Sequence, residues 1–290
     1  MQKNQKDSSD KPKQVRGKIH AYLFGKNCDV EALFQEGLSL LLNPKNINDW
    51  MMARNCLTKV AKQGHVDAQI QLGRMLSSGN PFNGRCYPVR ASLWFREAAR
   101  QGDADGMMEL GMMLFAGDGI RQNTVMALQW IEKAAALEHP CALLTLGTFY
   151  LRGCYSYYKD TSKGLEMLEK ACLKGSVEAN FLLGMVYLME DDVSCNVPLG
   201  IEHLKSASQN DFLVANYHLG MLYMTGQLVK QNKQAAAKWF TKSAENGHAP
   251  SQYAIGMMLL GGDGVKQDVA AAEDWIRTAY QATEGSGYGV

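Results

Sequence analysis

Apolar and polar positions recur along this chain with a period of 36 to 38 residues. Each copy carries a glycine inside an apolar run, here called the repeat glycine: Gly37, Gly73, Gly111, Gly147, Gly184, Gly220 and Gly256. A small residue stands five positions before it, Leu mostly one before it, and Leu or Tyr three after it. These offsets share one helical face, so the pattern predicts an amphipathic first helix in every copy.

A second recurring position lies 19 to 21 residues after each repeat glycine. This tryptophan position is occupied by Cys56, Trp94, Trp130, Met167, His203, Trp239 and Trp275. The residue three places before it is always Ala or Gly, and the residue directly after it is always bulky and apolar. The spacing predicts a second helix in each copy.

The repeat glycine needs a steric reason, because glycine inside a helix costs about 1 kcal/mol relative to alanine. We expect the two helices to approach so closely that a Cβ would clash, with the small residues of the second helix on the other side of the contact. One helix pair cannot bury both of its faces, so neighbouring pairs must stack. The sequence therefore predicts an all-α fold, an α/α solenoid of about seven helix-turn-helix repeats with a right-handed superhelical curve.

The predicted array spans residues 21–281 and is flanked by two tails. The expected repeats lie at about 30–64, 65–102, 103–139, 140–175, 176–211, 212–247 and 248–281. Residues 1–20 are mostly polar, and this composition predicts a disordered tail. Residues 282–290 are predicted to form a flexible C-terminal tail.

Charge and composition limit the classes of function. The chain has 30 Lys and Arg against 29 Asp and Glu, which argues against a broad nucleic-acid-binding face. No apolar stretch approaches a membrane span, and the N-terminus lacks the apolar core of a secretory signal. Seven cysteines fall at irregular places, which indicates free thiols in a reducing compartment and predicts a cytoplasmic location.

The recurring positions resemble the Sel1-like repeat, a relative of the tetratricopeptide repeat. The pattern A-x-x-x-L-G-x-x-Y-x-x-G-x-G-V, followed by A-x-x-W-x-x-K-A-A-x-x-G, is matched best from Ala215 to Gly247 and from Asp105 to Ala136. Departures from it include Glu36 in the Leu position, and Cys56 and His203 in the tryptophan position. The resemblance implies a protein-interaction adaptor, scaffold or regulator whose first helices line a concave face.

By that resemblance, the exposed concave positions lie three before, one after and four after the repeat glycine. The predicted binding stripe comprises Phe34, Ile70, Arg74, Met108, Met112, Phe115, Leu144, Phe181, Met185, Tyr217, Met221, Met224, Tyr253 and Met257. The stripe is rich in methionine, which suits adaptable apolar binding surfaces, and it predicts a groove for a partner helix or peptide. The alternative is that superhelical curvature buries these residues as ordinary core, because methionine also fills gaps in cores.

No catalytic constellation is visible in the sequence. It contains no phosphate-binding GxxxxGK[ST] motif and no zinc-type spacing of His or Cys, so we expect no catalytic, cofactor or metal residues. His65, His139 and His248 occupy one equivalent position between repeats, which favours a structural role.

The partner is expected to be a protein or peptide of unknown identity, with no nucleic acid and no membrane insertion. Two other functions remain open: a secreted bacterial effector that captures a host protein, with the polar N-terminus as its signal, and an inhibitor or immunity-type partner of one enzyme. Self-association through the apolar stripe is a further alternative.

Overall fold

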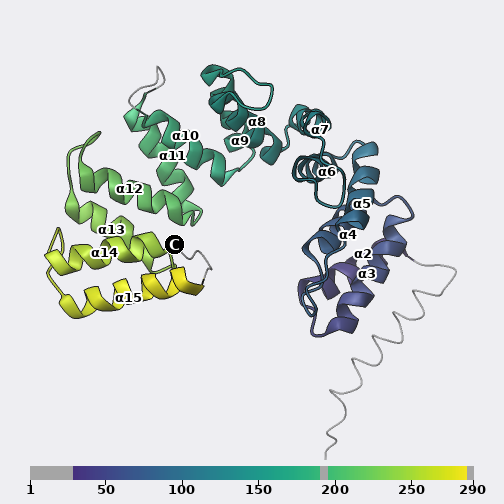
Figure 1. Cartoon of the computed structure of the whole chain (residues 1–290), viewed down its shortest axis with the longest axis horizontal. Coiled ribbons are helices and arrows are strands. Elements are labelled where there is room, and N and C mark those ends of the chain that lie inside the picture. Colours follow the sequence, from purple (N-terminus) through teal and green to yellow (C-terminus); the bar gives the residue numbers. More distant parts are fainter. Residues whose placement is uncertain (1–28, 190–194, 286–290) are drawn as a thin grey trace, which may run out of the picture. The chain divides into compact units, whose positions relative to one another are not determined.

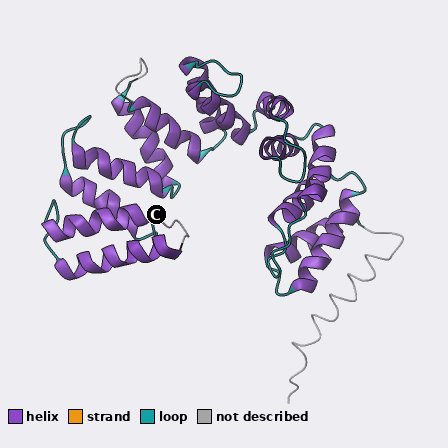
Figure 2. Ribbon diagram, in the orientation of Figure 1, coloured by secondary structure: helices purple, strands orange, loops and turns teal. Residues whose placement is uncertain are grey.

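The computed structural model describes residues 29–189 and 195–285, and their side chains except those of 283–285. Every regular element in these ranges is a helix, and loops join the helices (Figure 2). The predicted tail at 1–20, residues 190–194 and the last five residues lie outside the described part of the chain. The final helix ends at Gly285, four residues beyond the predicted end of the array at 281.

The helices form two compact units, divided between Ala142 and Leu143. The first unit contains α2 (Val30–Leu42), α3 (Ile47–Ala61), α4 (Val66–Ser78), α5 (Pro88–Arg100), α6 (Ala104–Ala116) and α7 (Thr124–Ala136). The second contains nearly all of α8 (Pro140–Arg152), then α9 (Thr161–Leu173), α10 (Val177–Tyr187), α11 (Val197–Gln209), α12 (Leu213–Thr225), α13 (Lys233–Ala244), α14 (Ala249–Gly261) and α15 (Val269–Gly285).

Seven pairs follow one another along the described chain, from α2–α3 to α14–α15 (Figure 1). Even-numbered helices carry the repeat glycines, and odd-numbered helices carry the tryptophan position. The prediction of an all-α helical-repeat fold is confirmed. The right-handed curve stays a prediction.

Capping residues set where the second helices begin. Asn123 Oδ1 accepts a hydrogen bond of 3.0 Å from the backbone N–H of Met126 at the start of α7. Asp160, Asn196, Asn232 and Asp268 cap α9, α11, α13 and α15 in the same way, each accepting from the N–H three residues on. These side chains satisfy backbone donors that have no partner inside the helix.

The repeat glycine is required by close helix packing, as predicted. A Cβ on Gly73 would lie 2.5 Å from a ring carbon of Phe95, and one on Gly220 would lie 2.5 Å from the same atom of Phe240. The small residue of the second helix was expected to supply this contact. Instead, the bulky side chain directly after the tryptophan position packs on the glycine in all seven pairs. The backbone carbonyl of the small residue adds a contact of 3.0 to 3.2 Å in four pairs, those of Ala127, Gly164, Gly200 and Ala272.

Buried amides join one repeat to the next, with one exception. Gln69 donates to the Ala61 carbonyl at 3.1 Å, and Gln252 donates to the Ala244 carbonyl at 3.1 Å. Asn216 occupies the equivalent position in α12, but it is one methylene shorter and neither its Oδ1 nor its Nδ2 has a partner. The Ser208 carbonyl, equivalent to those of Ala61 and Ala244, accepts instead from Lys242 at 3.0 Å. Asn216 is therefore a local weakness of the fold.

Gly256→Ala should destabilise the protein, because its Cβ would lie 2.7 Å from Ile276 and overpacking a core costs about 1–3 kcal/mol. Gly261→Ala is the matched control in the same helix, because the nearest atom to its Cβ is 3.6 Å away. Chemical denaturation should show a lower free energy of unfolding for Gly256→Ala and no decrease for Gly261→Ala. Equal effects would contradict the packing role of the repeat glycine.

Asn216→Leu should stabilise the fold by about 1–3 kcal/mol, because it removes a buried amide that has no hydrogen bond. The equivalent position holds a buried Leu143, so the fold accommodates leucine there. Gln69→Leu is the comparison variant and should destabilise by about 1 kcal/mol, because it removes a hydrogen bond. A Tm below that of the wild type for both variants, measured in thermal melts, would show that the buried Asn216 amide does not weaken the fold.

Candidate functional site

The predicted binding stripe divides into buried and exposed parts. Phe34, Ile70 and Met108 are buried, so the prediction of exposure is wrong for these three. Phe34 packs against the His65 ring, with the two centroids 4.5 Å apart. In the first unit these side chains complete the core between repeats, which is the alternative that the sequence left open.

Arg74 in α4 is occupied by ion pairs. Its Nε lies 2.7 Å from Glu109 and its guanidinium lies 3.5 Å from Asp105, both in α6. Partial burial lowers the pKa of Arg74, but the two carboxylates outweigh that effect and raise it above the ordinary value. Asp105 also contacts His139 at 2.8 Å. These ion pairs connect α4, α6 and the His139 position of the next repeat. The Arg74 charge is therefore paired within the fold.

The remaining stripe residue of high exposure in the first unit is Met112, at 45%. Phe115 is half-buried. In the first unit, Met112 is therefore the one apolar residue of the stripe that is well exposed, and the exposed Arg74 is held in ion pairs.

In the second unit, exposure along the stripe rises toward the end of the chain. Leu144, Phe181, Met185, Tyr217 and Met224 are half-buried. Phe181 and Met185 of α10 pack against the core cluster of Leu204 and Leu219, so they are partly used by the fold.

An exposed apolar patch lies on α12 and α14. It comprises Met221, Tyr253, Met257 and Leu260, with 37%, 47%, 44% and 39% of each residue exposed. Leu260 stands four after its repeat glycine, and the other three are members of the predicted stripe. Tyr217 and Met224 of α12 pack against the cluster that contains Ile255 and Met258 of α14, so the two helices are neighbours. We call these four residues the α12/α14 patch.

A pocket of about 270 Å³ adjoins this patch. It is lined by Ala249, Pro250, Tyr253, Ala279 and Tyr280, from α14 and α15. Tyr253 belongs to both the patch and the pocket, so an apolar ligand lying on the patch can also place a side chain in the pocket. The repeat pattern of the sequence does not reveal the pocket, because Tyr280 lies outside the repeated positions of the first helices.

Three histidines in the second unit have pKa values below the ordinary 6.5. Burial lowers the pKa of His218 and of His248, and the neighbouring His218 lowers that of His248 further. Burial also lowers the pKa of His203, although Glu202 and Glu169 oppose it. The His218 ring contacts Phe181 and Tyr217, at centroid distances of 5.4 and 5.7 Å.

The histidines at the equivalent position between repeats have structural contacts, as expected. The rings of His65 and His139 accept hydrogen bonds from the N–H of Ala68 and Ala142, each at 3.3 Å. His248 contacts the hydroxyl of Ser251 at 2.8 Å. Among the described side chains, no group of three His, Cys, Asp or Glu is arranged to hold a metal ion. No helix in the described ranges has the length and apolar character needed to cross a membrane.

The family comparison agrees with this geometry. The Sel1 repeat model matches residues 66–103, 104–139, 142–176, 177–212, 213–248 and 249–283. The chain belongs to the Sel1 repeat family. The resemblance seen in the sequence is thus confirmed, and the α2–α3 pair, which carries Glu36 and Cys56, precedes the six matched Sel1 repeats.

Solved structures show the same fold. A Sel1 repeat protein from Oxalobacter formigenes has a TM-score of 0.76 and 23% identity, over 86% of this chain and 99% of that one. The protective antigen c5321 of uropathogenic Escherichia coli has a TM-score of 0.72 and 21% identity, and the match covers 95% of this chain but only 57% of c5321. Immunity protein Pa5087 from Pseudomonas aeruginosa has a TM-score of 0.51 and 20% identity, over 87% and 81%. No curated protein matches the chain. At these identities the likeness concerns the fold alone.

The histidines predict a loss of stability in acid. The unfolded chain protonates its histidines near pH 6.5, whereas the folded protein holds His218 neutral to a lower pH. The unfolded state therefore binds more protons below about pH 6.5, and the Tm should fall as the pH drops from 7.5 to 5.5. His218→Phe keeps the ring contacts and should reduce this fall. An unchanged pH dependence in that variant would rule out His218 as a contributor.

Proposed function

We propose that this Sel1 repeat protein is a non-catalytic adaptor or regulator, cytoplasmic in location, that binds a protein partner on the α12/α14 patch. Four exposed apolar side chains on adjacent helices are the observation that carries the proposal. Helical-repeat folds of this family typically act as protein-interaction scaffolds, which supports the coarser part of it.

The partner element that fits the patch best is an amphipathic helix or an apolar extended segment. Methionine side chains adapt to different partner shapes, and tyrosine offers a large contact area with little loss of side-chain entropy. The neighbouring pocket of about 270 Å³ has room for one apolar anchor. Such anchors in central pockets supply most of the binding energy of protein interfaces.

A second candidate is an inhibitor that forms a one-to-one complex with a single enzyme. It is favoured by the fold shared with the Pseudomonas aeruginosa immunity protein Pa5087. The two candidates use the same surface and differ in the number of partners, so the number and identity of the proteins captured on the patch discriminate between them. The effector alternative rests on the N-terminal tail, which lies outside the described residues.

The test uses the double variant Met221→Glu/Met257→Glu as bait beside the wild type. Because charges on the patch oppose burial of an apolar ligand, we expect the partner captured from the source cell to bind at least ten-fold more weakly, about 1.4 kcal/mol. The captured protein is then purified and its Kd is measured by calorimetry, which also gives the stoichiometry.

Leu173→Glu is the matched control, since Leu173 is 86% exposed on α9 and lies outside the stripe. It introduces one glutamate on the same unit, away from the patch, and should leave binding unchanged. Equal binding by the wild type and the double variant would overturn the proposal, as would equal losses in the double variant and the control. Thermal melts of all the baits check that the fold is kept.

A further inference from the structure

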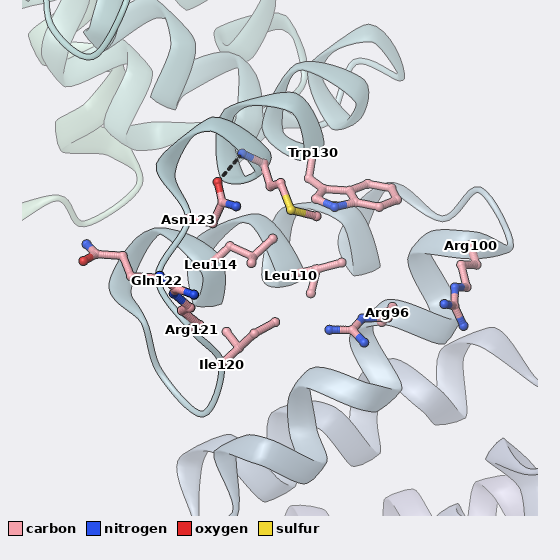
Figure 3. A pocket seen from close by; sticks show the side chains of 10 residues that line it. Arg96, Arg100, Leu110, Leu114, Ile120, Arg121, Gln122, Asn123 and Trp130 are labelled. Atoms are coloured by element: carbon pink, nitrogen blue, oxygen red, sulfur yellow. Dashed lines mark hydrogen bonds between the residues drawn. The ribbon is translucent and has the colours of Figure 1, made fainter.

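The first unit has a pocket of about 650 Å³ between α5, α6 and α7 (Figure 3). Its apolar lining comes from Leu110 and Leu114 of α6 and from Met126 and Trp130 of α7. Its charged lining is entirely basic: Arg96, Arg100 and Arg121. Figure 3 shows Arg96 extending from α5 toward Leu110 and Ile120. The pocket thus combines an apolar surface with three guanidinium groups.

Backbone contacts fix the loop that presents Arg121. A Cβ on Gly119 would lie 2.3 Å from the backbone of Pro88, so only glycine lets the loop sit this close to the start of α5. Gln122 donates to the Phe115 carbonyl at 2.9 Å, and the N–H of Asn123 donates to Leu114 at 2.9 Å. The loop is held at both ends, and Arg121 is therefore positioned at the pocket by the fold.

A second pocket of about 630 Å³ lies one repeat earlier, between α3, α4 and α5. Leu72, Leu76 and Trp94 line it at the positions that Leu110, Leu114 and Trp130 occupy in the first pocket. Arg54 and Arg90 supply its positive charge. Helix α5 contributes to both pockets, so they are adjacent on the first unit.

Most of these arginines have no carboxylate partner. Within the described part of the chain, no Asp or Glu lies at ion-pair distance from Arg54, Arg90, Arg96 or Arg121. Arg54 lies over the ring of Trp50 at 5.6 Å, and Arg90 lies over the ring of Tyr87 at 5.8 Å. Arg100 pairs with Glu97 at 2.7 Å, and Glu97 is the one carboxylate that lines either pocket.

This positive charge is local rather than general. Residues 29–142 contain 11 Lys and Arg against 12 Asp and Glu. Five of the seven arginines in that range line the two pockets. The other two are Arg74, which is ion-paired with α6, and Arg85, which lies in an exposed loop. The fold therefore gathers five arginines around two apolar pockets, and four of them have no carboxylate partner among the described residues.

We propose that the two pockets form a second binding site, which takes an acidic peptide segment of a protein partner. Aromatic or aliphatic side chains of the segment enter the pockets, and its Asp or Glu carboxylates pair with the surrounding arginines. Arginine matches carboxylates with two parallel hydrogen bonds. Two consecutive pockets with equivalent Leu and Trp linings and nearby arginines suit an extended segment that repeats this alternation of apolar and acidic residues.

A peptide fits these pockets better than a nucleic acid does. A phosphate backbone carries a charge at every nucleotide, so it would have to place a phosphate near Glu97 beside Arg100. A peptide can place an apolar residue there instead. Single-stranded nucleic acids also need open aromatic faces for base stacking. The Lys133 ammonium lies 4.4 Å from the ring centre of Trp130 and covers one face of that ring. The leucine and methionine lining favours apolar side chains instead.

The test begins with selection of 12-residue peptides from a random phage-displayed library on the full-length protein. We expect the selected sequences to be rich in Asp and Glu next to Leu, Phe or Trp. A fluorescein-labelled selected peptide is then titrated by fluorescence polarisation. Arg96→Glu/Arg121→Glu should weaken its binding at least ten-fold, and added salt should weaken binding to the wild type.

Arg85→Glu is the control, because it reverses an arginine charge on the same unit outside both pockets, and it should leave peptide binding unchanged. Met221→Glu/Met257→Glu should also leave it unchanged, which separates this site from the α12/α14 patch. Thermal melts confirm that each variant is folded.

Three results would overturn the inference. The first is a selection that gives no peptides or peptides without acidic residues. The second is an equal loss of binding in the Arg85 control or in the Met221/Met257 variant. The third is binding of a labelled 12-nucleotide adenosine RNA that is lost in Arg96→Glu/Arg121→Glu, with no acidic peptide bound, because the site would then belong to nucleic acid.

Discussion

The structure depends on the contact between the repeat glycine and the bulky side chain that follows the tryptophan position. In α4 and α5 this contact brings Phe95 onto the backbone of Gly73, where no Cβ fits. The same arrangement joins Gly220 to Phe240 in α12 and α13. Because the contact is buried inside each helix pair, it fixes how the two helices of a pair lie, and it leaves the outward positions of both helices free to vary.

Those outward positions are where the repeats differ. Arg74 and Met221 each stand one residue after a repeat glycine, yet the first is held in ion pairs and the second is exposed. The second helices vary in the same way, since Trp130 lines a basic pocket whereas its equivalent His203 stacks on Tyr187. Repeats with one internal packing scheme thus carry surfaces of different chemistry, which suits a protein with more than one binding site.

The period of the sequence was sufficient to predict the helix pairs and the steric need for glycine, because both depend on contacts inside one repeat. It was not sufficient to separate surface from core along the stripe. Burial of Ile70 and Met108 depends on how neighbouring repeats stack, and the same offset leaves Tyr253 exposed. Nor did the near-zero net charge reveal the basic pockets, because Arg96 and Arg121 lie on different elements and come together only in the fold.

The principal helix contacts all join helices that are consecutive in the sequence, such as α4 with α5 and α5 with α6. Short loops separate the partners, so little chain entropy is lost when they meet. During synthesis, each pair within a unit can therefore dock on the pair before it as soon as it leaves the ribosome, without waiting for distant parts of the chain. Apolar helix faces then stay uncovered only for the time needed to translate the next repeat.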